Sequence, residues 1–310
     1  MTRSPVAFLL CAVLLACSTP HAPPPPHPTL GPQRIAFWRA VRDRNGALSE
    51  QDAPRVNELA VELAGTLLRS ADGALRDGVA TDVLEMWIRK DKQLGPDGLK
   101  RLVPELYEGL KVGIGAIGDD SVYGRSFSAL VLSMIAARDA KEPFLSDAEL
   151  SAMLDRAAWY AGAELDLRGH DDVGGWAHAG AHTADWLRAL GVHAALGPTR
   201  SRQVLDAVSS LVVRRHATIF AYGEDGRLAQ AVLAVVHNGA LAQGAWAQWL
   251  EDLAAPLGQQ SGPSFDKALF AAQRNSRNLL FTLFVQLSML TEPTSAESAA
   301  LTELKALLAE

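Results

Sequence analysis

Cysteine is almost absent from this sequence of 310 residues, and both copies, Cys11 and Cys17, lie near its start. The rest of the chain therefore cannot use disulfides, a cysteine nucleophile or thiolate metal ligands. Turn-bounded runs of Val, Ile and Thr are also scarce, so helix is the default expectation for a chain dominated by Ala and Leu. There is no basic block, and the formal net charge is -6, which argues against a nucleic-acid partner.

The N-terminal stretch MTRSPVAFLLCAVLLAC has the pattern of an export signal. Arg3 precedes an apolar run over 6–16, which is shorter than the ~20 residues that span a bilayer but suits a signal peptide. The run ends in LLAC, which resembles a bacterial lipobox. The resemblance implies that 1–16 is a signal peptide and that Cys17 is lipidated. Ser18, the next residue, favours the outer membrane, facing the periplasm, whereas an ordinary secretory signal is the alternative.

A proline-rich stretch over 17–32 follows this signal. Proline lacks an amide hydrogen and fixes φ, so the stretch cannot form a helix. We expect an extended tether that joins a lipid on Cys17 to one all-helical domain over 33–310. The expected partners are the membrane, through the lipid, and an envelope protein or small-molecule ligand.

Beyond the tether, apolar residues recur with helical spacing. The expected helices cover 34–44, 53–70, 75–91, 97–116, 122–139, 147–168, 175–195, 200–220, 227–253, 265–290 and 294–309. Ser146 with Glu149, and Thr294 with Glu297, have the spacing of capping boxes. Paired helices would give units typical of a HEAT- or armadillo-like stack of antiparallel hairpins, and an α/α toroid is the alternative. The sequence thus predicts an all-α fold.

The densest chemistry lies in GWAHAGAHTADWL, which contains His178, His182 and Asp185. On a helix over 175–195, at 100° per residue, these three side chains would project from one face. On the preceding helix, over 147–168, Glu164 and Arg168 have the spacing of an intrahelical ion pair.

If these two helices pack as a hairpin, Glu164 or Asp166 would face the two histidines. Three interpretations stay open. In the first, His178, His182 and Asp185 bind a divalent ion such as zinc, although the catalytic Glu of HExxH is absent. In the second, the histidines and carboxylates act as acids and bases, or bind a ligand, in a pocket walled by Trp159, Trp176 and Trp186. In the third, the polar groups satisfy one another across the hairpin.

Several of these strings resemble the bacterial "domain of unknown function 2785" family. They are ELDLRG from Glu164, GWAH from Gly175, AH and AD ending at His182 and Asp185, LRD at Leu75–Asp77, RSFS at Arg125–Ser128 and NSRNLL at Asn275–Leu280. The resemblance implies an all-helical fold and carries no established activity. The leader and the proline tether depart from the family pattern.

Two functions follow as hypotheses. The first is an envelope lipoprotein that binds a ligand or protein through a polar pocket around the GWAHAGAHTAD string; its expected binding residues are Arg76, Asp77, Arg125, Asp166, Arg168 and Trp176. The second is a hydrolase-like enzyme using His178, His182, Asp185 and Glu164, with or without metal. The sequence favours binding, because it contains no GxSxG elbow, phosphate loop or complete metal motif.

Overall fold

A computed structural model describes residues 29–90, 92–214, 216–260 and 262–309. The α-helices are α1 Pro32–Asp43, α2 Val56–Gly65, α3 Gly73–Leu75, α4 Asp82–Glu85, α5 Pro96–Gly109, α6 Ser121–Lys141, α7 Asp147–Ala163, α8 Ala179–Gly191, α9 Pro198–Val213, α10 Glu224–Asn238, α11 Ala245–Ala254, α12 Lys267–Ser288 and α13 Ser295–Ala309. Short 3-10 segments are η1 Ala53–Arg55, η2 Leu67–Arg69 and η5 Ala255–Gly258, and π-helical segments are η3 Arg76–Thr81 and η4 Met86–Lys90. The strands β1 His170–Asp171 and β2 Gly175–Trp176 form one small antiparallel hairpin. The predicted all-α fold is confirmed.

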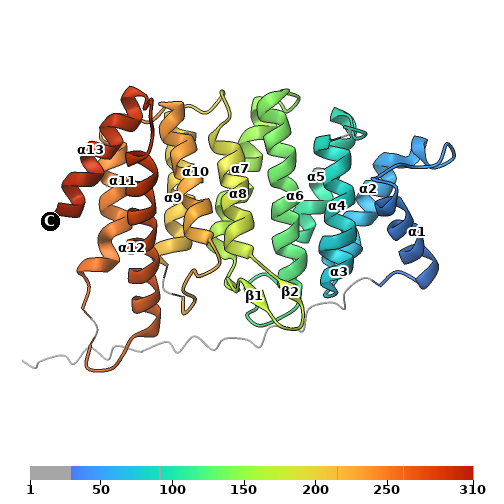
Figure 1. Cartoon of the computed structure of the whole chain (residues 1–310), viewed down its shortest axis with the longest axis horizontal. Helices are drawn as coiled ribbons and strands as arrows, with labels where there is room; N and C mark the ends of the chain where they lie inside the picture. Colours follow the sequence, from blue (N-terminus) through green and yellow to red (C-terminus); the bar gives the residue numbers. More distant parts are fainter. Residues whose placement is uncertain (1–28, 91, 215, 261, 310) are drawn as a thin grey trace, which may run out of the picture.

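The helices stack side by side in an open array (Figure 1). One layer contains α6, α8, α10 and α12, and the other contains α7, α9, α11 and α13; within each layer every helix packs against the next. From α5 to α13 consecutive helices run in opposite directions, whereas α3, η3, α4 and η4 follow one another without a turn; α1 and α13 lie at opposite ends of the molecule (Figure 1). One apolar core runs through the stack and includes the fully buried Trp38, Trp87, Trp186 and Trp249.

Local sequence signals account for several helix starts. Ser146 and Glu149 form the expected capping box at α7, and Thr294 with Glu297 exchange the same pair of hydrogen bonds before α13. Pro96 stands in the first turn of α5, where its missing amide hydrogen costs nothing.

Other helix boundaries differ from the expectation. The helix expected over 147–168 ends at Ala163, and the one expected over 175–195 begins only at Ala179. The single helix expected over 227–253 is two helices, because Gly239 and Gly244 both adopt positive φ.

Long connections gather on one edge of the stack, the edge that carries β1 and β2, which we call the hairpin edge (Figure 1). It holds the connections 110–120 and 164–178 and the described residues 214, 216–223, 259–260 and 262–266, whereas 142–146, 192–197, 239–244 and 289–294 turn at the opposite edge. Loops on a helical scaffold often carry the binding residues. No helix in the described part of the chain is long and apolar enough to cross a bilayer.

Candidate functional site

The segment between α7 and α8 is a folded loop that ends in the β1–β2 hairpin. Asp171 shapes the turn by accepting hydrogen bonds from the amides of Val173 and Gly174. Gly174 must be glycine, because a Cβ there would lie 1.8 Å from the hydroxyl of Tyr123. The hairpin is therefore pressed against α6.

His178 lies where this loop enters α8. Its backbone has φ of 52°, a left-handed conformation that costs a non-glycine residue about 1–3 kcal/mol. The imidazole is 9% exposed, and its Nε2 is buried without a hydrogen-bond partner. Burial, with smaller contributions from Arg227 and His170, lowers the pKa of His178 to about 4, so the ring is neutral at pH 7.

Aromatic rings connect His178 to the surface. Trp176 stacks on it with ring centroids 4.2 Å apart and an interplanar angle of 30°, and Tyr222 meets Trp176 edge-on at 5.6 Å. Trp176 is 41% exposed and Tyr222 is 50% exposed. Gly169 allows Tyr222 to lie against the loop, since a Cβ at Gly169 would fall 2.1 Å from the Tyr222 ring.

His182 lies deeper, on the first turns of α8. Its ring centroid is 5.8 Å from that of His178. The Ser126 hydroxyl on α6 donates to the carbonyl of Ala177 and lies 2.8 Å from His182 Nδ1. Burial, followed by His178 and Arg227, lowers the pKa of His182 to about 3. The two imidazoles thus lie near each other, and both are neutral at pH 7.

Asp185 does not complete a metal site with them. Its carboxylate accepts from Arg227 on α10 at 2.5 Å, so it is paired with a cation from the next helix of its layer. No group of three or more His, Cys, Asp or Glu within the described ranges is arranged to hold a metal ion. The expectation that His178, His182 and Asp185 project from one helix face is wrong for His178, which precedes the helix in a left-handed conformation, and the Asp185 carboxylate is engaged by Arg227.

Glu164 also lies away from the histidines. It is fully buried and forms a two-point ion pair with Arg125, with Nε–Oε2 at 2.6 Å and Nη2–Oε1 at 3.0 Å. Tyr160 and the amide of Asp166 donate to the same carboxylate. The expected ion pair between Glu164 and Arg168 is absent, because α7 ends before either residue.

The remaining expected binding residues mostly hold the loop in place. Asp166 accepts from the amide of Gly118, and Arg168 pairs with Asp166 and Asp171 at 3.4 Å each. Figure 1 shows how the connection before α6 and the hairpin lie together at the same edge. These contacts join two loops of the hairpin edge.

Arg76, at the start of η3, reaches the hairpin from a distant part of the sequence. It donates to the carbonyls of Gly174 at 2.6 Å and Trp176 at 3.1 Å, while its guanidinium carbon lies 3.9 Å from the centroid of the Tyr123 ring. Its neighbour Asp77 is exposed and forms no ion pair within the part of the chain that the structure describes. Arg76 is therefore a structural clamp on the hairpin, and Asp77 lies outside the site.

Three residues of this site had no signal in the sequence. Ser126 belongs to the RSFS string, which by itself points to no site, and Tyr222 and Arg227 belong to no pattern that points to a binding site. Of the tryptophans expected to wall a pocket, Trp176 alone contacts the histidines, while Trp186 is fully buried in the core.

A family model described as "Protein of unknown function (DUF2785)" matches residues 110–285, more than half of the 310-residue chain. The match includes the histidine and aromatic cluster, which consists of Trp176, His178, His182 and Tyr222, whereas Arg76 precedes the matched range. No curated protein and no solved structure matches this chain.

Proposed function

Since this chain belongs to the DUF2785 family of proteins of unknown function, we propose that it is a binding protein that takes a small ligand at the hairpin edge, between His178, Trp176 and Tyr222. One observation carries the proposal: the buried Nε2 of His178 has no hydrogen-bond partner. Buried polar atoms in folded proteins are almost always paired, and leaving one unpaired costs about 1–3 kcal/mol. A polar group of a ligand would remove that cost.

The backbone of His178 supports the same proposal. Its left-handed conformation is a second energetic cost, in addition to that of the unpaired nitrogen. Backbone strain of this kind concentrates at ligand-binding positions. Arg76 and Asp171 fix the loop around it, so the strained conformation is held by contacts from outside the loop as well as within it.

The chemistry of the surrounding groups favours an uncharged ligand with a flat or ring-shaped part. Both imidazoles are neutral at pH 7, and Arg227 is already paired with Asp185. The exposed rings of Trp176 and Tyr222 would contact the apolar face of the ligand, while His178 would exchange a hydrogen bond with a hydroxyl or carbonyl.

The geometry favours binding over hydrolysis. Ser126 is fully buried and donates to a carbonyl, so it does not face a substrate. Glu164 and Asp185 are both held by arginines. Imidazoles with pKa values of about 4 and 3 are weak bases at neutral pH, which lowers their value in acid–base catalysis.

The cellular setting belongs to the same proposal. The signal peptide, the lipidated Cys17 and most of the proline-rich tether fall on residues 1–28, outside the described residues. We propose a lipoprotein of the outer membrane whose binding domain faces the periplasm at the end of a tether. The two-layer stack of antiparallel helices supports a HEAT-like repeat as the scaffold.

The binding proposal is tested with defined probes: glucose, N-acetylglucosamine, adenosine and glycerol 3-phosphate. Binding is measured by calorimetry for the unsubstituted protein, His178→Asn and His237→Asn. Asparagine tolerates the left-handed conformation, and His237 is an exposed histidine at the opposite edge, so the second variant controls for the substitution itself. We expect an uncharged ring compound to bind, with affinity at least tenfold lower in His178→Asn alone. Equal affinity in all three proteins, or no binding by any probe, would contradict the proposal.

A further inference from the structure

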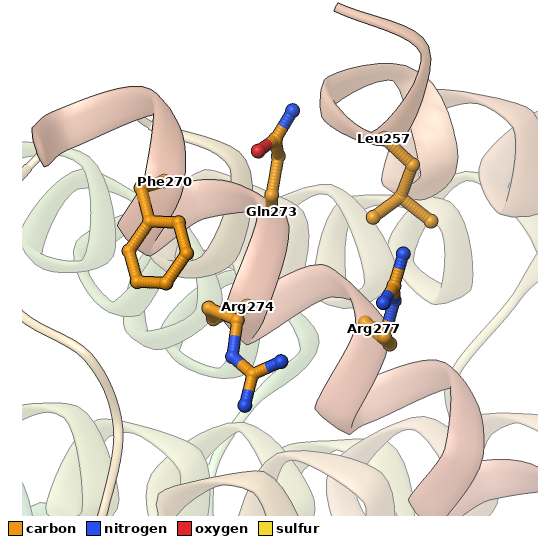
Figure 2. A pocket seen from close by; sticks show the side chains of 5 residues that line it. All are labelled: Leu257, Phe270, Gln273, Arg274 and Arg277. Carbon is orange, nitrogen blue, oxygen red and sulfur yellow. The ribbon is translucent and has the colours of Figure 1, made fainter. Parts of the chain in front are cut away.

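A pocket lies near the C-terminal end of the stack, between η5 and α12 (Figure 2). Its volume is about 170 Å³, and it is lined by Leu257, Phe270, Gln273, Arg274 and Arg277. It is separate from the histidine and aromatic cluster, because none of its residues belongs to that cluster.

The pocket is formed by one face of α12. Phe270, Gln273, Arg274 and Arg277 are spaced as successive positions on a single side of a helix, and Figure 2 shows Leu257 opposite them. The Gln273 amide donates to the carbonyls of Pro256 at 3.0 Å and Gln259 at 2.9 Å. These two bonds attach the η5 segment to α12 and so fix the distance between the two walls.

The pocket carries two positive charges, on Arg274 and Arg277. Many arginines of the described chain pair with carboxylates, as Arg34 does with Glu62 and Arg200 with Asp147. Arg274 and Arg277 are exposed, and neither takes part in an ion pair within the described residues. Two cations therefore border the same small pocket, and no carboxylate of the described residues forms an ion pair with either.

Apolar side chains line the pocket beside the arginines. Phe270 is 39% exposed, and the ring of Phe265, which lies outside the pocket lining and is 71% exposed, has its centroid 5.5 Å from that of Phe270. Leu257 adds an aliphatic wall. In Figure 2, the Phe270 ring lies beside Arg274, while the guanidinium of Arg277 lies beside Leu257. An apolar wall and positive charge are thus next to each other.

We propose that this pocket binds a compact aromatic anion, in which a carboxylate or phosphate monoester is attached to a single ring. Arginine binds such groups through two parallel hydrogen bonds and also interacts with ring faces. A cavity of about 150 Å³ is enough to hold one benzene molecule, so the pocket suits a ligand with one ring. The inference is independent of the function proposed for the hairpin edge, because the two sites share no residue.

The test uses phenyl phosphate, inorganic phosphate and phenol as probes, measured by calorimetry at one fixed low ionic strength. We expect phenyl phosphate to bind at least tenfold more tightly than either fragment. The double variant Arg274→Ala/Arg277→Ala should lose at least tenfold in affinity for phenyl phosphate. The control Arg39→Ala/Arg101→Ala removes two exposed arginines on α1 and α5, in the N-terminal part of the stack, and should keep the original affinity.

A third variant, Phe270→Ala, separates the ring from the charge. It should reduce the affinity for phenyl phosphate to that for inorganic phosphate. The proposal is overturned if phenol binds as tightly as phenyl phosphate, if the double variant at Arg274 and Arg277 retains the original affinity, or if Phe270→Ala binds phenyl phosphate unchanged. Melting temperatures within a few degrees of the unsubstituted protein show that each variant is folded.

Discussion

The hydroxyl of Ser126 and Nδ1 of His182 lie 2.8 Å apart, in the buried contact between α6 and α8. Ser126 uses its hydrogen to donate to the carbonyl of Ala177, so its oxygen is left to accept. The proton of His182 must therefore be on Nδ1, and Nε2 carries the lone pair. Ser126 on α6 thus fixes the tautomer of His182. Through its bond to the Ala177 carbonyl it also fixes the backbone next to His178.

Replacing Ser126 by Ala should leave Nδ1–H of His182 and the carbonyl of Ala177 buried without partners. We expect a loss of about 1–3 kcal/mol in the free energy of unfolding, measured by urea denaturation. The control is Ser128→Ala on the same helix, because the Ser128 hydroxyl bonds only the Gly124 carbonyl one turn back. An equal loss in the two variants would show that the contact with His182 contributes nothing specific.

Local sequence signals predicted the scaffold well. The capping boxes at Ser146 and Thr294 and the prolines at helix starts act within one turn, so they can be recognised without knowledge of the fold. Gly239 also carried a usable signal, since glycine commonly ends a helix in the left-handed conformation.

The loop around the histidines could not be predicted in the same way. The spacing of Glu164 and Arg168 predicted a helix that continues past Ala163, where α7 ends. In the fold, Glu164 pairs instead with Arg125, which is 39 positions away in the chain. Tyr222, in the connection before α10, contacts the His178 ring, and Arg227 on α10 bonds the Asp185 carboxylate. Contacts between residues so far apart depend on how the helices stack, and periodicity carries no information about that.

The ion pair of Arg125 and Glu164 gives a second prediction. Both side chains are fully buried, so removing one partner leaves an uncompensated charge in the core. Arg125→Met alone should lower the free energy of unfolding by about 3–5 kcal/mol. The double variant Arg125→Met/Glu164→Leu should recover much of that loss, as measured in a double-mutant cycle. If the two single losses simply add, the pair does not interact as its geometry indicates.

The neutral histidines give a third prediction, on pH. In the folded protein burial holds the pKa of His178 at about 4, against 6.5 for an imidazole that is exposed to water. The unfolded chain therefore binds more protons between these values, and stability falls as the pH drops through 6.5 towards 4. His178→Asn removes this contribution, so between pH 7.5 and 5.0 it should lose roughly 2 kcal/mol less than the unsubstituted protein.

Urea denaturation at the two pH values checks this difference. Acid loss that arises from carboxylates is shared by both proteins and cancels in the comparison. Identical losses would mean that His178 is protonated equally in the folded and unfolded states.

The proposed lipid anchor gives a fourth prediction. Expressed in a bacterial host with an alkyne-bearing fatty acid, the full chain should incorporate the label and sediment with membranes. Cys17→Ser should lose the label, because the thiol is the acceptor, while Cys11→Ser should keep it. Labelling that persists without Cys17, or that disappears with Cys11, would contradict lipidation at Cys17.

Arg76 provides the last prediction, because it clamps the hairpin from outside the loop. Its guanidinium donates to Gly174 and Trp176 on the hairpin and to the carbonyls of Ser70 and Ala71 on its own segment. Lysine keeps the charge, but its ammonium group has three donors and lacks the planar fork of guanidinium, so it cannot bond all four carbonyls. Arg76→Lys should therefore release the hairpin without unfolding the stack. Hydrogen exchange should then accelerate at least tenfold at residues 169–178, while α10 keeps its protection. If exchange in the hairpin is unchanged, Arg76 does not hold it, and the contacts from α6, such as that of Ser126 with the Ala177 carbonyl, are enough to maintain the strained conformation of His178.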